Sequence, residues 1–283
     1  MASERYDELA ETLRGLRDRW EAVLGDWRAT GRLDLQGCRG IVDGIAICVP
    51  GEPTTAAACL RVSGPYAVAH AVNMTGLAIA AGKATGLFGQ ELRDLGLAAL
   101  LHDLGKEVPE GHPEAQALLV ADDHGLVAER LLADAGVALP VEVVVGIRDH
   151  HERTGRQGPG GREPSFLAAI VGFCDVVDSR LTPHFARGAT APDHALKLAL
   201  MVGDCFPKAV VKGVVDSFSA YPPGASVLLS DHRRGVVVQD RRQDCTRPVV
   251  EAEGELVDLA EAGLHVIDLV RVAGEALPVR ATA

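Results

Sequence analysis

The stretch LAALLHDLGK, residues 97–106, decides how the rest of the chain is interpreted. Its apolar part predicts a buried helix that runs from about Glu91 to His102. The helix ends in His102 and Asp103, two side chains of the kinds that bind transition metals. Lys106 follows three residues after Asp103, so we expect its ammonium group to face the same site and to attract a phosphate.

Other residues of the metal-binding kinds also stand at or near helix ends. His150 and His151 end a second predicted helix, and Asp175 follows the apolar run 167–174, where a carboxylate is costly to bury unless it is paired or bound to a metal. His70 and His124 lie within, or near the start of, further helices. A set of imidazoles and carboxylates suits Fe, Mn, Zn, Co or Ni. Two such ions can activate a water molecule and hold a phosphoryl group.

The remaining histidines and the cysteines receive no chemical role. No pair of the six cysteines has the CxxC spacing, so we expect reduced thiols and no zinc knuckle. The histidines treated as ordinary core or surface residues are His112, His184, His194, His232 and His265.

Composition excludes several classes of protein. With 47% hydrophobic residues the chain can form a large core. The net charge of −11, with no long basic run, argues against a duplex nucleic acid partner. The first 20 residues have no apolar signal-peptide core, and no apolar run is long enough to span a membrane, so we expect a cytoplasmic protein.

The pattern of apolar residues, glycines and prolines predicts a mainly α chain with a small β-rich C-terminal part. Glycines and prolines punctuate residues 31–53, so no helix is assigned there although 41–49 is apolar. A glycine-rich loop is expected at 154–164, and we expect ordering it on binding to cost conformational entropy. The expected helices span residues 3–28, 64–83, 91–102, 114–135, 140–151, 163–180, 192–202 and 207–219. The expected strands are a hairpin of 226–229 with 235–239, then 248–250 and 265–269.

The N-terminal helix carries an apolar stripe from Tyr6 to Trp27 with alternating spacings of three and four residues. Two interpretations remain open at this point. The stripe packs on the chain's own core, or residues 3–28 form a homodimer.

Several motifs together resemble the HD superfamily, and within it the HD-GYP family of cyclic-dinucleotide phosphodiesterases. The resemblance covers about residues 35–270. The matching segments are Tyr66-x-x-x-His70-x-x-Asn73, Leu101-His102-Asp103-Leu104-Gly105-Lys106, His124, His150-His151-Glu152-Arg153, Asp175-Val176-Val177-Asp178, and the tail from Tyr221-Pro222-Pro223-Gly224 to Arg247-Pro248-Val249-Val250.

The resemblance implies a fold, a site and a reaction. It implies an HD-domain helical bundle with an N-terminal helical extension (1–53), a catalytic core (54–222) and a small C-terminal β-hairpin appendix (223–283). Two divalent metals, Fe or Mn, would be bridged by Asp103, and a bridging hydroxide would attack the phosphorus. Lys106 would bind a substrate phosphate. The implied metal ligands are His70, His102, Asp103, His124, His150, His151 and Asp175.

Three departures from the family pattern affect the substrate more than the metals. The loop that carries the family's GYP tyrosine has none here, and His184 stands near the position of an expected phosphate-binding arginine. Arg153, with Arg180 or Arg187 as a substitute for the missing arginine, then completes the expected substrate contacts. Tyr66 replaces a glutamate found in members with three metals, which favours two.

Four functions follow as alternatives. The first is a phosphodiesterase acting on a cyclic dinucleotide, with cyclic di-GMP as the reference substrate. The second is a phosphohydrolase for another nucleotide or phosphate ester, and the third is a non-catalytic nucleotide-binding signalling module. A di-iron oxygenase is the fourth, but Lys106 and the HD-GYP-like tail argue against it.

Overall fold

The computed structural model describes residues 2–49, 61–111, 123–184, 190–221, 223–241, 244–272 and 275–276. Two residues singled out from the sequence, His112 and Arg187, lie outside these ranges, as does the first part of the helix expected at 114–135. The cysteines that the structure describes are free thiols, as expected.

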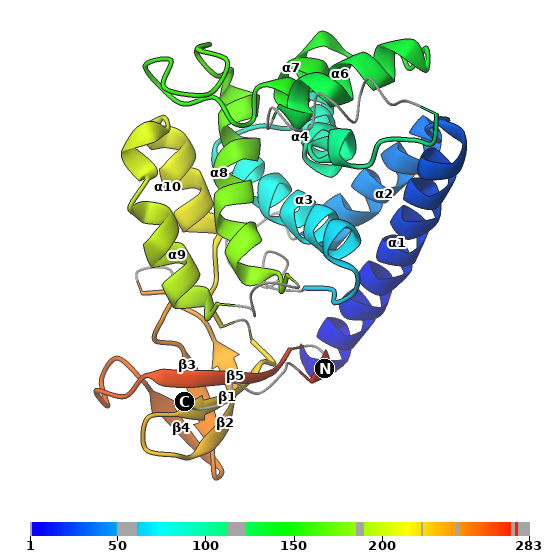
Figure 1. The fold of residues 1–283 in the computed structure, drawn as a ribbon. Coiled ribbons are helices and arrows are strands. Elements are labelled where there is room, and N and C mark those ends of the chain that lie inside the picture. Colours follow the sequence, from blue (N-terminus) through cyan, green and yellow to red (C-terminus); the bar gives the residue numbers. More distant parts are fainter. Residues whose placement is uncertain are drawn as a thin grey trace.

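Most of the chain forms a helical body around α3, which is buried along nearly its whole length (Figure 1). Over the residues that the structure describes, the helices expected from the sequence are confirmed, with ends that differ by a few residues, and α2 is an additional helix. The helix bounds are α1 Ala2–Thr30, α2 Leu35–Cys48, α3 Tyr66–Ala84, α4 Gly89–Leu101, α6 His124–Asp134, α7 Val141–Arg148, α8 Phe166–Leu181, α9 Pro192–Leu200 and α10 Lys208–Ser217, with short 3-10 turns η1 Leu104–Lys106 and η2 Gly203–Cys205.

The apolar stripe of α1 packs inside the chain. Leu13, Trp20 and Trp27 are buried, and α1 lies against α2 and α3. The indole nitrogen of Trp27 also donates to the carbonyl of Glu107 at 2.7 Å, which ties the helix to the segment after η1. The stripe therefore packs on the chain's own core, which was the first of the two interpretations. A homodimer through residues 3–28 remains a prediction.

Helix α2 was not expected from the glycine-punctuated sequence. Asp34 caps its start by accepting the N–H of Gly37, and a buried apolar face runs from Cys38 to Cys48. Gly44 faces α1, where an added Cβ would lie 2.7 Å from Leu16. The glycine therefore allows two helices to approach closely, and tertiary packing outweighs its low helix propensity.

The C-terminal part forms an antiparallel sheet in the order β4-β3-β2-β1-β5-β6. The predicted hairpin is β1 (Ser226–Leu229) with β2 (Arg234–Gln239), and the two further predicted strands are β3 (Val249–Ala252) and β5 (Val266–Val272). The strands β4 (Glu255–Asp258) and β6 (Glu275–Ala276) were not predicted. The mainly α fold class with a small C-terminal β part is confirmed, while the three-part domain division remains a prediction.

Three glycines let neighbouring segments of the helical body touch. An added Cβ would lie 1.9 Å from the carbonyl oxygen of His124 at Gly105, 2.4 Å from that of Arg148 at Gly125, and 2.1 Å from that of His150 at Gly172. Each contact is with backbone, which has little room to move away. Among the described helices, none is both long and apolar enough to cross a membrane.

We predict that Gly105→Ala lowers the free energy of unfolding by about 3 kcal/mol, because the new methyl group collides with the backbone of α6. Urea denaturation followed by circular dichroism measures the change. Gly15→Ala is the control, since nothing lies within 4 Å of its added Cβ and a helical alanine should stabilise by about 0.5–1 kcal/mol. Equal stability of the Gly105→Ala variant and the unsubstituted chain would contradict the prediction.

Candidate metal centre

The seven predicted ligands come together from five segments of the helical body. His70 lies on α3 and Asp175 on α8, whereas the others stand at helix ends. The remaining five are His102 and Asp103 after α4, His124 at the start of α6, and His150 and His151 after α7.

The ligand atoms form two groups joined by one carboxylate. His70, His102 and Asp103 offer ligand atoms within 4.8 Å of one another, and so do His124, His150 and His151. Asp103 Oδ1 lies 3.4 Å from Nε2 of His102 in the first group and 3.1 Å from Nε2 of His124 in the second. Asp103 therefore occupies the position between the groups that a bridging ligand needs.

Asp175 approaches the first group from α8. Its Oδ1 lies 3.1 Å from His70 Nε2 and 4.0 Å from His102 Nε2. The structure thus brings all seven predicted residues into one cluster.

Three of the histidines are oriented by the same physical arrangement. Nδ1 of His102 lies 2.8 Å from the carbonyl of Ala99, and Nδ1 of His150 lies 2.7 Å from that of Ile147. A carbonyl can only accept, so each Nδ1 carries the proton and each Nε2 turns its lone pair into the cluster. His70 is oriented in the same way by a carboxylate in place of a carbonyl, since its Nδ1 lies 2.7 Å from Asp178 Oδ2.

Asp178, which was not proposed as a site residue, is the centre of a buried polar network. Arg61 donates to its Oδ1 at 2.6 Å, and the Thr182 hydroxyl donates to its Oδ2 at 2.8 Å. Arg61 also donates to Thr182 at 2.6 Å, so the carboxylate that orients His70 is itself fixed. The sequence held a signal for it, because the spacing of Asp175 and Asp178 places both on one helix face.

Burial and charge set the protonation of the cluster. Burial lowers the pKa of His150 well below its usual value, and the neighbouring histidines lower it further. Burial likewise lowers the pKa of His151 to about 4. Burial alone would lower the pKa of His70, but hydrogen bonds to Asp175 and Asp178 raise it to about 10. The carboxylates therefore favour positive charge at His70 Nε2, which a metal ion supplies as well as a proton does.

The residues present fit a metal ion. Nε2 of His70, Nε2 of His102 and Oδ1 of Asp103 are buried and make no well-aligned hydrogen bond, although charged groups stand close by, with Asp175 3.1 Å from His70 and Lys106 2.8 Å from Asp103. Leaving such atoms unpaired is costly, and a cation among them would satisfy all three. The pKa of Asp103 is also held well below its usual range, since the nearby histidines and Lys106 outweigh the effect of burial.

Lys106 faces the cluster, as predicted. Its Nζ lies 2.8 Å from Asp103 Oδ1 and 2.9 Å from Oδ2. Its side chain is 47% exposed, so the ammonium group stands between the buried carboxylate and solvent. That place suits a charge that meets an incoming anion.

The predicted arginines make their described contacts elsewhere. Arg153 donates to the carbonyls of His150 and Glu152, and its guanidinium lies 4.4 Å above the ring of Phe206. Arg180 donates to the carbonyl of Val176. Their roles in substrate binding remain predictions.

An aromatic pair stands beside the first group of ligands. The ring of Tyr66 stacks on His70 with centroids 5.0 Å apart and an interplanar angle of 10°. His184, to which the sequence gave no role, meets Tyr66 edge to face at 4.9 Å. Two departures from the family pattern are therefore in contact with each other next to the cluster.

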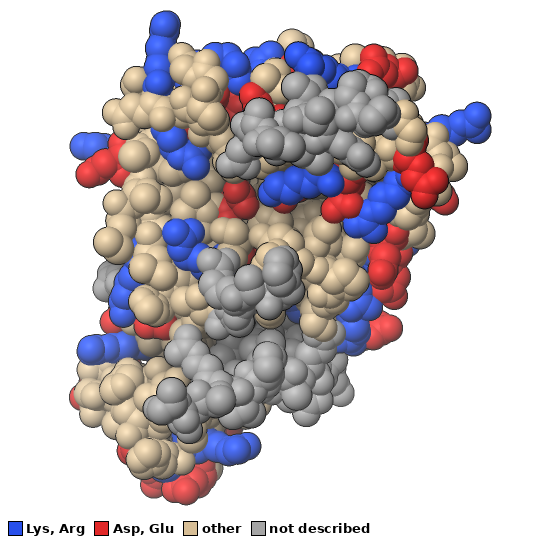
Figure 2. All heavy atoms as spheres, in the orientation of Figure 1, with Lys and Arg blue, Asp and Glu red and all other residues tan. Residues whose placement is uncertain are grey.

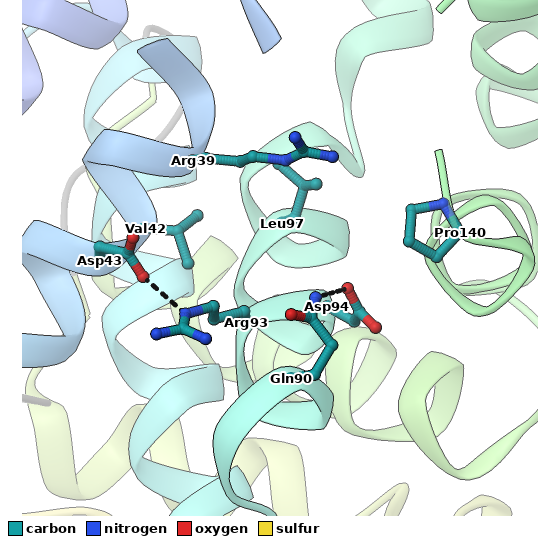
Figure 3. A pocket seen from close by; sticks show the side chains of 8 residues that line it. All are labelled: Arg39, Val42, Asp43, Gln90, Arg93, Asp94, Leu97 and Pro140. Atoms are coloured by element: carbon teal, nitrogen blue, oxygen red, sulfur yellow. Dashed lines mark hydrogen bonds and ion pairs between the residues drawn. The ribbon is translucent and has the colours of Figure 1, made fainter. Parts of the chain in front are cut away.

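A separate pocket of about 310 Å³ lies between α2 and α4 (Figure 3). Val42 and Leu97 line it, and two pairs of its polar side chains bind each other, with Arg93 3.1 Å from Asp43 and Gln90 2.8 Å from Asp94. None of the seven ligand-type residues lines it. We therefore regard the buried cluster, and not this pocket, as the candidate functional site, because buried polar atoms without hydrogen bonds are costly unless a ligand binds them.

The fold and the cluster define an HD-domain protein, and comparison with known proteins agrees. Residues 67–180 match the HD domain family. The chain carries an HD domain, which confirms the resemblance seen in the sequence.

Two known proteins are similar to this chain over most of its length. The cyclic di-GMP phosphodiesterase PA4108 of Pseudomonas aeruginosa is 29% identical over 266 residues, which cover 86% of this chain and 64% of the relative. The chain thus spans slightly less than two thirds of that protein. Among solved structures, Bd1817, an HDG"Y"P protein from Bdellovibrio bacteriovorus, matches with a TM-score of 0.54 over 72% of this chain and 69% of that one. At 19% identity this likeness shows the fold alone.

We predict that Asp178→Asn weakens metal binding by about 10–100-fold, because the orienting partner of His70 loses its charge. Titration of the apo-protein against a competing chelator measures the affinity. Asp216→Asn, at a half-exposed aspartate of α10, is the matched control and should leave affinity unchanged. An Asp178→Asn variant that binds metal as tightly as the control would show that the network does not act on the centre.

Proposed function

We propose that this chain is a metal-dependent phosphohydrolase that cleaves a cyclic dinucleotide, with cyclic di-GMP as the first substrate to test. The observation that carries the proposal is the pair of ligand groups on either side of Asp103, with Lys106 against the same carboxylate. The name of the Pseudomonas aeruginosa relative supports this choice of substrate.

The two ligand groups would hold two divalent metal ions, with iron and manganese as first choices because both accept imidazole and carboxylate ligands. When bound, the ions would activate a water molecule and stabilise negative charge on the phosphoryl group. Asp103 lies between the groups and would serve both ions.

The chain's own residues would orient and charge the site. Arg61 and Asp178 hold His70 in one orientation, so the ligand is positioned before a substrate arrives. The ammonium group of Lys106 would pair with a phosphate oxygen at the solvent side. Apolar helices surround the buried ligands, which lowers the local dielectric and strengthens these charge interactions.

The second candidate is hydrolysis of another nucleotide or phosphate ester, and it rests on the surroundings of the cluster. Tyr66 and His184 form an aromatic pair at positions where the family resemblance leads us to expect charged residues. Arg153 and Arg180 bind backbone carbonyls. We therefore propose that cyclic di-GMP is turned over slowly, or that a related cyclic dinucleotide is preferred.

The distribution of charge bears on whether the chain has a nucleic acid partner. On the face shown in Figure 2, the basic and acidic side chains that are coloured are interspersed rather than gathered into one basic stripe. With a net charge of −11, we propose no duplex nucleic acid partner.

The proposed activity is tested by turnover of cyclic di-GMP, a mixed cyclic dinucleotide and bis(p-nitrophenyl) phosphate with Mn²⁺ or, anaerobically, Fe²⁺. We predict slow turnover that depends on metal, and loss of both metal and turnover in Asp103→Ala, because that variant removes the shared ligand. Metal analysis accompanies each assay. Full metal loading without turnover of any of the three substrates would favour the non-catalytic signalling module. Fast, selective turnover of cyclic di-GMP would contradict the proposal that this substrate is turned over slowly.

We predict that Lys106→Ala keeps its metal but lowers kcat/KM by a factor equivalent to about 2–3 kcal/mol of transition-state stabilisation. The reason is that a charged contact to phosphate is lost while no metal ligand is removed. Metal analysis and steady-state kinetics on the same preparation separate the two effects. Lys212→Ala, at an exposed lysine of α10, controls for the loss of one positive charge. Loss of metal from Lys106→Ala would show that the lysine supports the centre itself.

A further inference from the structure

The 3-10 turn η1, which carries Lys106, is held from two sides. On one side it lies against α6, where Gly105 leaves no room for a side chain beside the carbonyl of His124. On the other side the segment after the turn contacts the C-terminal end of α1, the helix that runs along one side of the helical body (Figure 1). The first contact involves a candidate metal ligand, His124. The second involves none of the seven, so it calls for an explanation of its own.

Three hydrogen bonds join α1 to the residues that follow Lys106. Nε1 of Trp27 donates to the carbonyl of Glu107 at 2.7 Å, and Nε of Arg28 donates to Glu107 Oε2 at 2.6 Å. The backbone N–H of Glu110 donates to the carbonyl of Arg28 at 3.1 Å. We call these three hydrogen bonds the α1 tether. They hold both the backbone and the side chain of the residue next to Lys106.

The tether is anchored in the core at one end. Trp27 is 1% exposed and belongs to the apolar stripe that packs α1 against α2 and α3, so it cannot shift without disturbing close packing. The ion pair of Arg28 with Glu107 is nearer to solvent and contributes less by itself. Together the two side chains fix the segment after η1 to a helix that is itself fixed.

The position of Lys106 depends on this segment. The N–H of Lys106 donates to the carbonyl of Asp103 at 2.9 Å, and that of Glu107 donates to the carbonyl of Leu104 at 3.0 Å, so Glu107 closes the turn. The ammonium group lies 2.8 Å from Asp103 Oδ1, at the end of a long and flexible side chain. A shift of Glu107 would therefore move the turn, and the ammonium group would move with it.

We infer that Trp27 and Arg28 are positioning residues, which act through the α1 tether to hold η1 so that the ammonium group of Lys106 meets an incoming phosphate. The inference rests on the proposed function, in which Lys106 binds a substrate phosphate. Both residues stand on α1, outside residues 67–180 that match the HD domain family. Helix α1 would thus contribute to the site without supplying a metal ligand.

Hydrogen exchange followed by mass spectrometry tests the tether without any turnover. In the full chain loaded with Mn²⁺, peptides that cover residues 104–111 should exchange about threefold faster in Arg28→Gln than in the unsubstituted chain. The double variant Trp27→Phe with Arg28→Gln, which removes both side-chain donors, should exchange about tenfold faster. Arg19→Gln, at an exposed arginine of the same helix, is the matched control. Exchange at 104–111 that equals the control in both variants overturns the tether.

Steady-state kinetics test the effect on Lys106. We expect kcat/KM to fall about threefold in Arg28→Gln and about tenfold in the double variant, with unchanged metal content. The fall should be the same for cyclic di-GMP and bis(p-nitrophenyl) phosphate, because Lys106 would meet the phosphate of either. In a chain that already carries Lys106→Ala, Arg28→Gln should have no further effect, since the group that the tether positions is gone.

A merely structural role would give a different pattern. Arg28→Gln would then lower kcat/KM by the same factor with or without Lys106, or it would release metal, and either result overturns the inference. So does an unchanged kcat/KM in both tether variants. Absence of turnover in the unsubstituted, metal-loaded chain overturns the proposed function and with it the role of Lys106, while the exchange experiment still decides the tether. The two failures are therefore distinguishable.

Discussion

The structure depends on one constraint, which is that imidazoles and carboxylates are buried together in an apolar helical body. Each such group loses hydration and must recover it from a partner. The chain provides these partners in layers. Backbone carbonyls orient His102 and His150, and Asp178 orients His70 while Arg61 holds Asp178. The buried atoms left without a well-aligned hydrogen bond lie together, and a metal ion among them would satisfy them at once.

Close backbone contact makes this arrangement possible. Gly105, Gly125 and Gly172 each face a carbonyl of a neighbouring segment, and those segments carry His124, His150 or their neighbours along the chain. A side chain at any of the three would push two ligand-bearing segments apart. The same use of glycine recurs where Gly158 and Gly160 pack against Glu152, so these glycines mark close contact between segments.

The metal centre and the residues around it bear on different parts of the proposed function. In the proposed function the two ligand groups and Lys106 would act on a phosphate, and all of them follow the HD pattern. The surroundings differ from the pattern, because Tyr66 and His184 pair with each other and Arg153 turns to the backbone and Phe206. A change in substrate is compatible with an unchanged centre, since positioning and metal chemistry rest on different residues.

The sequence by itself predicted the helical class, which depends on local periodicity, and the family resemblance of its motifs predicted the seven ligand-type residues and Lys106, which the structure brings together. It did not predict α2, since glycine propensity is a local property and the contact of Gly44 with Leu16 is not. Nor did it assign a role to Asp178 or Arg61, whose hydrogen bonds join residues far apart in the chain. Only the tertiary structure decided these, because a buried charge takes the partner that packing brings to it, and no spacing along the sequence records that partner.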